Sequence, residues 1–228
     1  MRRQFLFGIL ALAAMPLIAT THTARAQSEQ QQVVNEAVGV VASFHHPGAY
    51  VDNVRGLVRR SRAIIIVPNL VKAGFIFGAQ GGTGVLLVHN RNGSWSYPAF
   101  YNMGAASFGF QAGIEVSKVV LIIMNDRALN LALTSAQLKL GAEAGLAIAT
   151  VGAGVEGSVT SAGADIYALS SSKGLFGGVA VQGGAIGPNQ DWNAAYYGGR
   201  IPTETIVYGR AHLHQRGASQ LRRALGRL

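Results

Sequence analysis

The chain has 228 residues, of which 49% are hydrophobic and 13% charged, with a formal net charge of +9 and a mean hydropathy of +0.27. This length fits one domain with a sizeable core, and the lack of cysteine in the sequence excludes disulfides, thiolate metal sites and a thiol nucleophile. The thirty glycines, roughly twice the usual share, favour turns, bulges and closely packed strands, because glycine in a helix is unfavourable by about 0.5–1 kcal/mol relative to alanine.

The first 26 residues have the pattern of a secretory signal peptide. Arg2 and Arg3 precede an apolar segment at residues 5–19, and Ala24-Arg25-Ala26 places small residues where a signal peptidase reads them. We expect cleavage after Ala26. The alternative is a membrane anchor, but fifteen apolar residues interrupted by Pro16 are short for the roughly 20 of a spanning helix. The two arginines also fit a twin-arginine signal, so the choice between this route and Sec stays open.

The predicted location is therefore the periplasm or envelope of a bacterium. Cleavage would leave sixteen Lys and Arg against ten Asp and Glu, a formal charge of +6. A basic exported protein is expected to meet anionic surfaces, either phospholipid headgroups or envelope polymers. Nucleic acid is not an expected partner outside the cytoplasm.

Residues 27–62 are predicted to be a helical segment. After polar, frayed residues at 27–32, apolar side chains recur at helical spacing from Val33 to Phe44, and His45-His46-Pro47-Gly48 ends this helix. A second helix follows, with basic residues at Arg55, Arg59, Arg60 and Arg62. Two interpretations stay open. The arginines form either the solvated face of a packing helix or the face of a helix that lies against an anionic membrane with its apolar residues inserted.

Short strands are predicted from Ala63 onward. An apolar run at 63–67, bounded by Pro68, has the pattern of a buried strand, and strands at 73–79 and 85–89 are joined by a glycine-rich turn at 80–84. Alternating or apolar segments at 105–115, 119–124, 140–158, 165–169 and 178–182 predict further strands, with a short helix at 128–133 capped by Asn125-Asp126 and a helical turn at 189–197. The fold class predicted is α+β, with N-terminal helices followed by a glycine-rich, mainly antiparallel sheet curled toward a barrel or sandwich.

Sequence motifs for catalysis or metal binding are not convincing in this chain. The glycines at 74–84 resemble a phosphate loop, but such a loop opens a helix, whereas the apolar residues at 85–88 predict a strand. His45-His46 point apart on a helix, and His212 and His214 have no carboxylate nearby. The Gly-x-Ser-x-Gly motif is absent from the sequence. We therefore predict a protein that is not an enzyme, with no catalytic residues, no metal site and no cofactor.

The segment from Ala63 to Arg210 contains an ordered set of short motifs. The motifs are Ala63-Ile64-Ile65-Ile66-Val67-Pro68, Lys72-Ala73-Gly74-Phe75-Ile76-Phe77-Gly78, Gly82-Thr83-Gly84-Val85-Leu86, Trp95-Ser96-Tyr97-Pro98-Ala99-Phe100, Gly109-Phe110-Gln111-Ala112-Gly113, Asn125-Asp126-Arg127-Ala128-Leu129, Tyr167 with Ser170-Ser171, Lys173-Gly174-Leu175-Phe176-Gly177-Gly178 and Asn193 with Tyr196-Tyr197-Gly198. In this order and spacing the set resembles the SYLF domain family, formerly called the yeast-type actin-binding domain family.

The resemblance implies lipid binding without catalysis. Eukaryotic relatives bind phosphoinositides and, in fungi, actin. For an exported bacterial chain the implied partner is an anionic phospholipid or another envelope lipid, and actin is not expected. Lipid contact is implied for basic residues before and within the glycine-rich core, namely Arg55, Arg59, Arg60, Arg62 and Lys72. The alternative function is a structural or protein-interaction module of the periplasm or outer membrane, with an envelope protein as partner.

Residues 211–228 depart from these motifs. This tail mixes leucines with arginines, and from Ser219 it is predicted to be either a short amphipathic basic helix that contacts a membrane or a disordered tail. The predicted organisation is a signal peptide at 1–26, a helical segment at 27–62, a SYLF-like core at 63–210 and a basic tail at 211–228.

Overall fold

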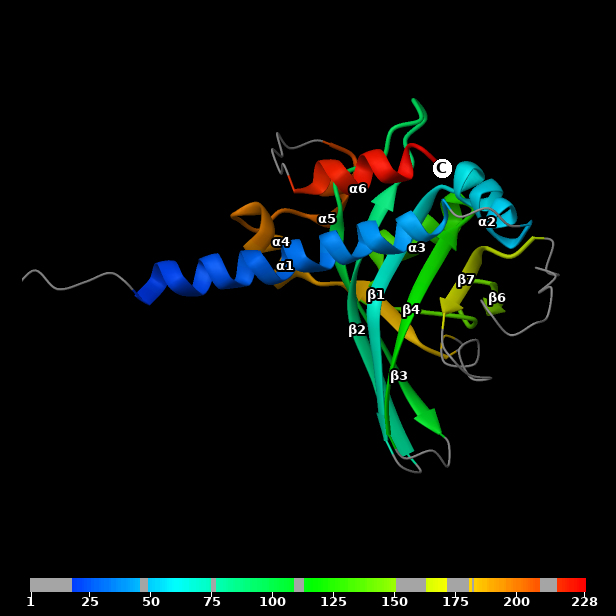
Figure 1. The fold of residues 1–228 in the computed structure, drawn as a ribbon, viewed down its shortest axis with the longest axis horizontal. Coiled ribbons are helices and arrows are strands. Elements are labelled where there is room, and N and C mark those ends of the chain that lie inside the picture. Colours follow the sequence, from blue (N-terminus) through cyan, green and yellow to red (C-terminus); the bar gives the residue numbers. More distant parts are fainter. Residues whose placement is uncertain are drawn as a thin grey trace, which may run out of the picture.

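The computed structural model describes residues 18–45, 49–74, 77–108, 113–150, 163–171, 181, 183–209 and 217–228, which form an eight-stranded sheet with helices (Figure 1). The strand order is β5-β8-β3-β2-β1-β4-β7-β6, and all neighbouring strands are antiparallel except β6 and β7. The predicted α+β class, with N-terminal helices followed by a curled and mainly antiparallel sheet, is confirmed.

Four long strands make the centre of the sheet. They are β1 (Ala63–Gly74), β2 (Phe77–Val88), β3 (Ala99–Phe108) and β4 (Gly113–Ile123). The shorter strands are β5 (Leu138–Lys139), β6 (Leu146–Thr150), β7 (Ile166–Ser171) and β8 (Ala185–Pro188). Strand β8 was not predicted. The predicted strand at 178–182 lies outside the described residues except for Val181, which is in a turn.

Two helices precede the sheet. Helix α1 (Ile18–Ser43) begins well before Val33, so the expectation of a frayed segment at 27–32 was wrong. Side-chain hydrogen bonds one turn apart stabilise this part of the helix, because the amides of Gln31 and Gln32 donate to Asn35 and Glu36 at 2.9 Å. The predicted cleavage after Ala26 falls within α1 and stays a prediction. Helix α2 (Ala49–Arg60) follows at the predicted place.

The sheet is buried on both faces around residues 63–67, 85–88 and 119–123. On one face, Ile65 and Leu121 pack with α3 (Asp126–Thr134), and on the other face, Ile64 and Ile122 pack with α1 (Figure 1). Successive side chains of a strand point to opposite faces, so both sets must be apolar. This explains why these strands appear in the sequence as continuous apolar runs.

Strand β1 continues through Pro68, where the sequence predicted its end. Its pairing with β2 shifts register between Ile66 and Val71, and its pairing with β4 shifts between Val67 and Leu70. Both shifts place one extra residue in β1, which defines a β-bulge. Proline, which lacks a backbone N–H, is tolerated at a bulge, so it does not end the strand here.

The glycines at residues 80–84 lie inside β2 and not in the predicted turn. A Cβ on Gly82 would overlap the carbonyl oxygen of Asn69, and a Cβ on Gly84 would overlap that of Ile66. The bulge of β1 therefore approaches β2 too closely for any side chain at these two positions. Glycine is required by this close approach of backbone to backbone.

Beyond the bulge, the four long strands continue as an arm, made of residues 71–74, 77–82, 104–108 and 113–117 (bottom of Figure 1). Alternation in β4 places Ile114 and Val116 on the same face as Ile122, the α1 face. Ile114 is 78% and Val116 55% exposed, and Val116 lies opposite Val71, which is 41% exposed. The arm therefore carries an exposed apolar face.

Among the described residues after β8 there are three short helices. They are α4 (Gln190–Tyr197), α5 (Thr203–Val207) and α6 (Ala218–Leu225). Side-chain caps begin two helices. The side chain of Asn125 accepts from the Ala128 amide at 2.9 Å in α3, as predicted, and that of Asn189, for which no cap was predicted, accepts from the Trp192 amide at 3.0 Å in α4. In the predicted tail, α6 packs against α1 and buries Leu221. Its apolar face thus belongs to the core.

The carboxylate of Asp165 joins α3, β6 and β7. It accepts hydrogen bonds from Asn125 Nδ2 at 2.6 Å and from the Gly145 amide at 2.7 Å, and it pairs with Arg127. These contacts, with the Asn125 hydrogen bond as the largest cause, hold the pKa of Asp165 below its ordinary value of 3.8.

We expect Asp165→Asn to lower the free energy of unfolding by about 1.5 kcal/mol at pH 7, because it removes charge-assisted hydrogen bonds. A carboxylate with a lowered folded-state pKa stabilises the protein above its unfolded pKa and loses this effect as pH falls through the folded pKa. The difference between variant and wild type should therefore shrink below about pH 4, as urea denaturation across pH would show. A constant difference from pH 7 to pH 2 would contradict this assignment.

Candidate functional site

Helices α2 and α6 and the loop at 89–98 lie at the end of the sheet opposite the arm (Figure 1), and each of these segments contains arginines. Two hydrogen bonds join these segments. Arg59 Nε of α2 donates to the Leu228 carbonyl oxygen at 2.5 Å, and Arg222 Nε of α6 donates to the Trp95 carbonyl oxygen at 2.7 Å. We call this surface the basic end and define it by Arg59, Arg60, Arg62, Arg91, Arg222, Arg223 and Arg227.

The apolar side of α2 faces the interior of the protein. Val54, Leu57 and Val58 are buried in the core on the α1 side of the sheet. The expectation that α2 inserts its apolar residues into a membrane is therefore wrong for these three side chains. With these side chains buried, the arginines form the outward face of a helix that packs on the protein. This agrees with the first interpretation of the α2 sequence, a packing helix with a solvated basic face.

The structure gives most of the predicted arginines internal partners. Arg55 Nε donates to the Phe44 carbonyl oxygen at 2.7 Å, and Arg62 pairs with Asp126 at 2.6 Å. Arg60 is exposed and forms no hydrogen bond or ion pair with the part of the chain that the structure describes. These side chains thus position α2 on the fold while their charge stays at the surface.

Lys72 lies apart from the arginines. It belongs to the arm, where it is opposite Gln80 of β2 and Glu115 of β4. It lies nine residues further along β1 than Ala63, which at about 3.3 Å per residue is roughly 30 Å. The structure therefore places the four predicted arginines of residues 55–62 on α2 or just after it, three of them in the basic end, and does not bring Lys72 to them.

The Trp-Ser-Tyr-Pro motif forms a fixed loop at the basic end. The Trp95 indole is buried and stacks on His89, with the ring centroids 4.5 Å apart. Ser96 Oγ accepts from the Val88 amide at 2.9 Å, and Gly93 has a positive φ of 78° in the turn between them. These contacts fix the loop edge that faces α6.

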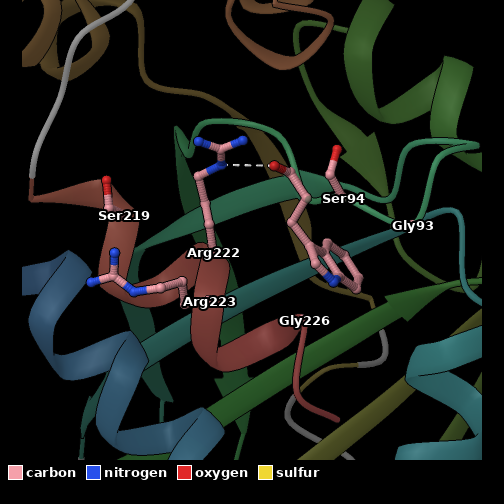
Figure 2. A pocket seen from close by; sticks show the side chains of 7 residues that line it. Gly93, Ser94, Ser219, Arg222, Arg223 and Gly226 are labelled. Carbon is pink, nitrogen blue, oxygen red and sulfur yellow. Dashed lines mark hydrogen bonds between the residues drawn. The ribbon is translucent and has the colours of Figure 1, made fainter.

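A pocket of about 300 Å³ lies between this loop and α6 (Figure 2). Its lining residues are Gly93, Ser94, Trp95, Ser219, Arg222, Arg223 and Gly226. Figure 2 shows Ser219, Arg222 and Arg223 on α6. Ser219 is three and four residues before the two arginines, whereas the arginines are consecutive and their side chains point in different directions. The lining carries two positive charges and no carboxylate.

Arg222 is held from two directions. Besides the hydrogen bond from Nε to Trp95, its guanidinium lies over the ring of Tyr97, 4.5 Å from the centroid. Such a cation–π contact contributes about 0.5–1 kcal/mol at an exposed site. A second hollow of about 500 Å³ lies on the other side of the loop, where Arg62 and Arg91 line it but Arg62 is already paired with Asp126.

Comparison with known proteins assigns the family. A family model described as "Ysc84: Las17-binding protein actin regulator" matches residues 104–228, more than half of the chain. The chain belongs to the Ysc84 family. This confirms the resemblance to SYLF domains that the motifs indicated. The Ysc84 match extends past residue 210, where the core was predicted to end, and it includes α6.

Curated relatives support the Ysc84 assignment. The chain is similar to "SH3 domain-containing YSC84-like protein 1" of Bos taurus, with 30% identity over 154 residues, which are 67% of this chain and 45% of the relative. It is also similar to "LAS seventeen-binding protein 3" of Saccharomyces cerevisiae strain S288c, with 31% identity over 182 residues, 77% of this chain and 39% of the relative. The chain thus spans less than half the length of these relatives.

The predicted site residues did not include α6, although a basic membrane-contacting helix from Ser219 was one of the two alternatives for the tail. The signal for its docked position is present, since Ala218, Leu221, Leu225 and Leu228 follow helical spacing and all four are buried. Within the described ranges, His, Cys, Asp and Glu side chains form no group of three that suits a metal ion. None of the described helices has both the length and the hydropathy to cross a membrane. The Ysc84 description is that of a binding regulator and names no reaction.

Proposed function

We propose that this chain is a lipid-binding module of a bacterial cell envelope, exported through its predicted signal peptide and without catalytic activity. The observation that carries the proposal is the basic end, where α2, α6 and the loop at 89–98 contribute arginines to one surface. Each Lys or Arg near an anionic membrane contributes about 1 kcal/mol of binding free energy. A few arginines are therefore sufficient for reversible attachment to anionic phospholipid.

The binding is electrostatic and peripheral. The apolar sides of α2 and α6 are occupied by the core, so little apolar surface of these helices is left for insertion. The exposed Arg60, Arg91, Arg223 and Arg227 make the headgroup contacts, while Arg55, Arg59 and Arg62 hold α2 in place and add positive charge. Attraction between exposed charges weakens as the ionic strength rises. Binding should therefore be sensitive to salt.

Removing two charges from the basic end tests this function. We expect the double variant Arg60→Gln/Arg227→Gln to bind phosphatidylglycerol-containing vesicles roughly thirtyfold more weakly, since each arginine contributes about 1 kcal/mol. Co-sedimentation with vesicles measures the affinity. Lys139→Gln/Arg200→Gln removes the same charge outside the basic end and should bind like wild type. Equal affinity of the wild-type protein for neutral and anionic vesicles, unaffected by salt, would refute the proposal.

The second candidate is a structural or protein-interaction module of the periplasm or outer membrane. The exposed apolar face of the arm, with Ile114 78% exposed, favours it, because soluble proteins rarely leave clustered apolar side chains uncovered. A stoichiometric protein partner recovered from envelope extract, together with no affinity for vesicles, would decide for this function.

A further inference from the structure

We propose that the pocket between the 93–95 loop and α6 binds one phosphate group, supplied by a phospholipid headgroup or by free phosphate. That a lipid headgroup supplies the phosphate rests on the lipid binding proposed above. That the pocket binds a phosphate group does not. Attraction by a diffuse positive surface depends on the charge of a headgroup and not on its shape. A pocket that binds one phosphate would add a preference among headgroups of equal charge.

Arg222 supplies a preorganised donor. Its Nε is committed to the Trp95 carbonyl oxygen and its plane lies over Tyr97, so the guanidinium has one orientation. In the described part of the chain, its two terminal nitrogens have no hydrogen-bond partner. A guanidinium that is already fixed in place loses less side-chain entropy when it binds an oxyanion.

Two further donors line the same pocket. Ser219 lies on the turn of α6 before Arg222, Arg223 follows Arg222 directly, and neither has a hydrogen-bond partner among the described residues. Figure 2 shows the Arg223 side chain pointing away from Arg222, so its guanidinium must turn toward Arg222 to bind the same ligand. A phosphate presents three or more oxygens and a carboxylate only two, so a phosphate can accept from Arg222 and from these donors together.

The size and the field of the pocket agree with this ligand. A volume of about 300 Å³ is several times the ~30 Å³ of a water molecule, so a phosphate enters with its first waters. Gly226 at the end of α6 also lines the pocket, and the C-terminus of a helix carries about half a negative charge. Arg222 and Arg223 carry two full positive charges, which exceed the half negative charge of the helix C-terminus. The electric field in the pocket therefore attracts an anion.

Titration of the full chain with inorganic phosphate at constant ionic strength tests the site. We expect saturable shifts of the Arg222 Nε–H and Ser219 amide NMR signals, which chloride does not produce. Arg223→Gln should weaken phosphate binding at least tenfold and Ser219→Ala several-fold, while the matched control Arg200→Gln should leave it unchanged. Arg223 is exposed and makes no described contact, so its variant is expected to fold normally. Absence of a saturable shift, or equal affinity in all four proteins, would overturn the proposal.

Vesicles separate the two sources of phosphate. The matched control is Arg227→Gln, which removes one charge of the basic end outside the pocket. If a headgroup fills the pocket, Arg223→Gln loses more affinity for phosphatidate vesicles than Arg227→Gln does, and free phosphate competes with the wild-type protein. If the protein binds phosphate but does not bind vesicles, free phosphate is the ligand of the pocket and the proposed lipid function fails. If the protein binds vesicles and Arg223→Gln has only the effect of Arg227→Gln, the headgroup source is excluded while lipid binding stands.

Discussion

Gly84→Ala is expected to destabilise the protein by about 3 kcal/mol, a large share of the 5–15 kcal/mol that typically separates folded from unfolded domains. Gly84 is buried in β2, and a Cβ there would overlap the Ile66 carbonyl oxygen and lie 2.8 Å from Val67 Cγ2. The bulge of β1 cannot withdraw without breaking its own pairing with β4, so the overlap must be relieved by displacing backbone. Guanidinium denaturation of both proteins measures the change.

The same strand provides a matched control. Gly81 is exposed in β2, and a Cβ there would make only an ordinary contact at 3.7 Å with the Met103 carbonyl oxygen. Gly81→Ala should therefore change the free energy of unfolding by less than about 1 kcal/mol, in part because alanine restricts the unfolded chain. Equal destabilisation by the two substitutions would show that the close approach at the bulge is not the cause.

Asn193→Ala is expected to destabilise the protein by about 2–3 kcal/mol. Asn193 is fully buried in α4, and its Oδ1 accepts from the Phe100 amide of β3 at 2.7 Å. Strand β8 ends at Pro188, opposite Tyr101, so the Asn193 side chain takes the place of a strand partner for the preceding residue. Its removal leaves a buried N–H without an acceptor, which costs about 1–3 kcal/mol, and it also leaves a small cavity.

Amide hydrogen exchange identifies the mechanism. In Asn193→Ala the Phe100 amide should exchange faster than its neighbours in β3, while the exposed control Asn130→Ala on α3 should leave both stability and exchange unchanged. An unaltered unfolding midpoint for Asn193→Ala would mean that water or a shifted backbone group replaces the amide. The Asn193 motif residue would then have no structural role of this kind.

Strands could be predicted from the sequence where the residues of the strand alone carry the pattern. Ala63–Val67 and Val119–Ile123 are apolar throughout because both faces of their strands are covered, and this pattern is visible without knowledge of their neighbours. The glycines at 80–84 were misassigned because glycine serves equally in turns and at close approaches. Only the position of the β1 bulge, in another strand, distinguishes the two uses.

The candidate site could be predicted in charge but not in shape. The arginines of α2 are evident from the sequence, whereas their acceptors are backbone carbonyls, such as that of Leu228, 169 residues from Arg59. Arg222 reaches Trp95 across 127 residues. Any carbonyl can accept such a bond, so no residue type marks the partner in the sequence. The pocket between the loop and α6 therefore required the tertiary structure.

The arm has a consequence for a molecule attached by its basic end. The twelve residues of β1, at about 3.3 Å each, hold the far end of the arm roughly 40 Å from that attachment. This is about five Debye lengths at physiological ionic strength. Ile114 and Val116 would then stand beyond the reach of the membrane's surface charge and sample the bulk solvent. Salt would weaken the contacts at the headgroups without weakening the apolar contacts at the arm. Varying the ionic strength can therefore separate the two kinds of binding.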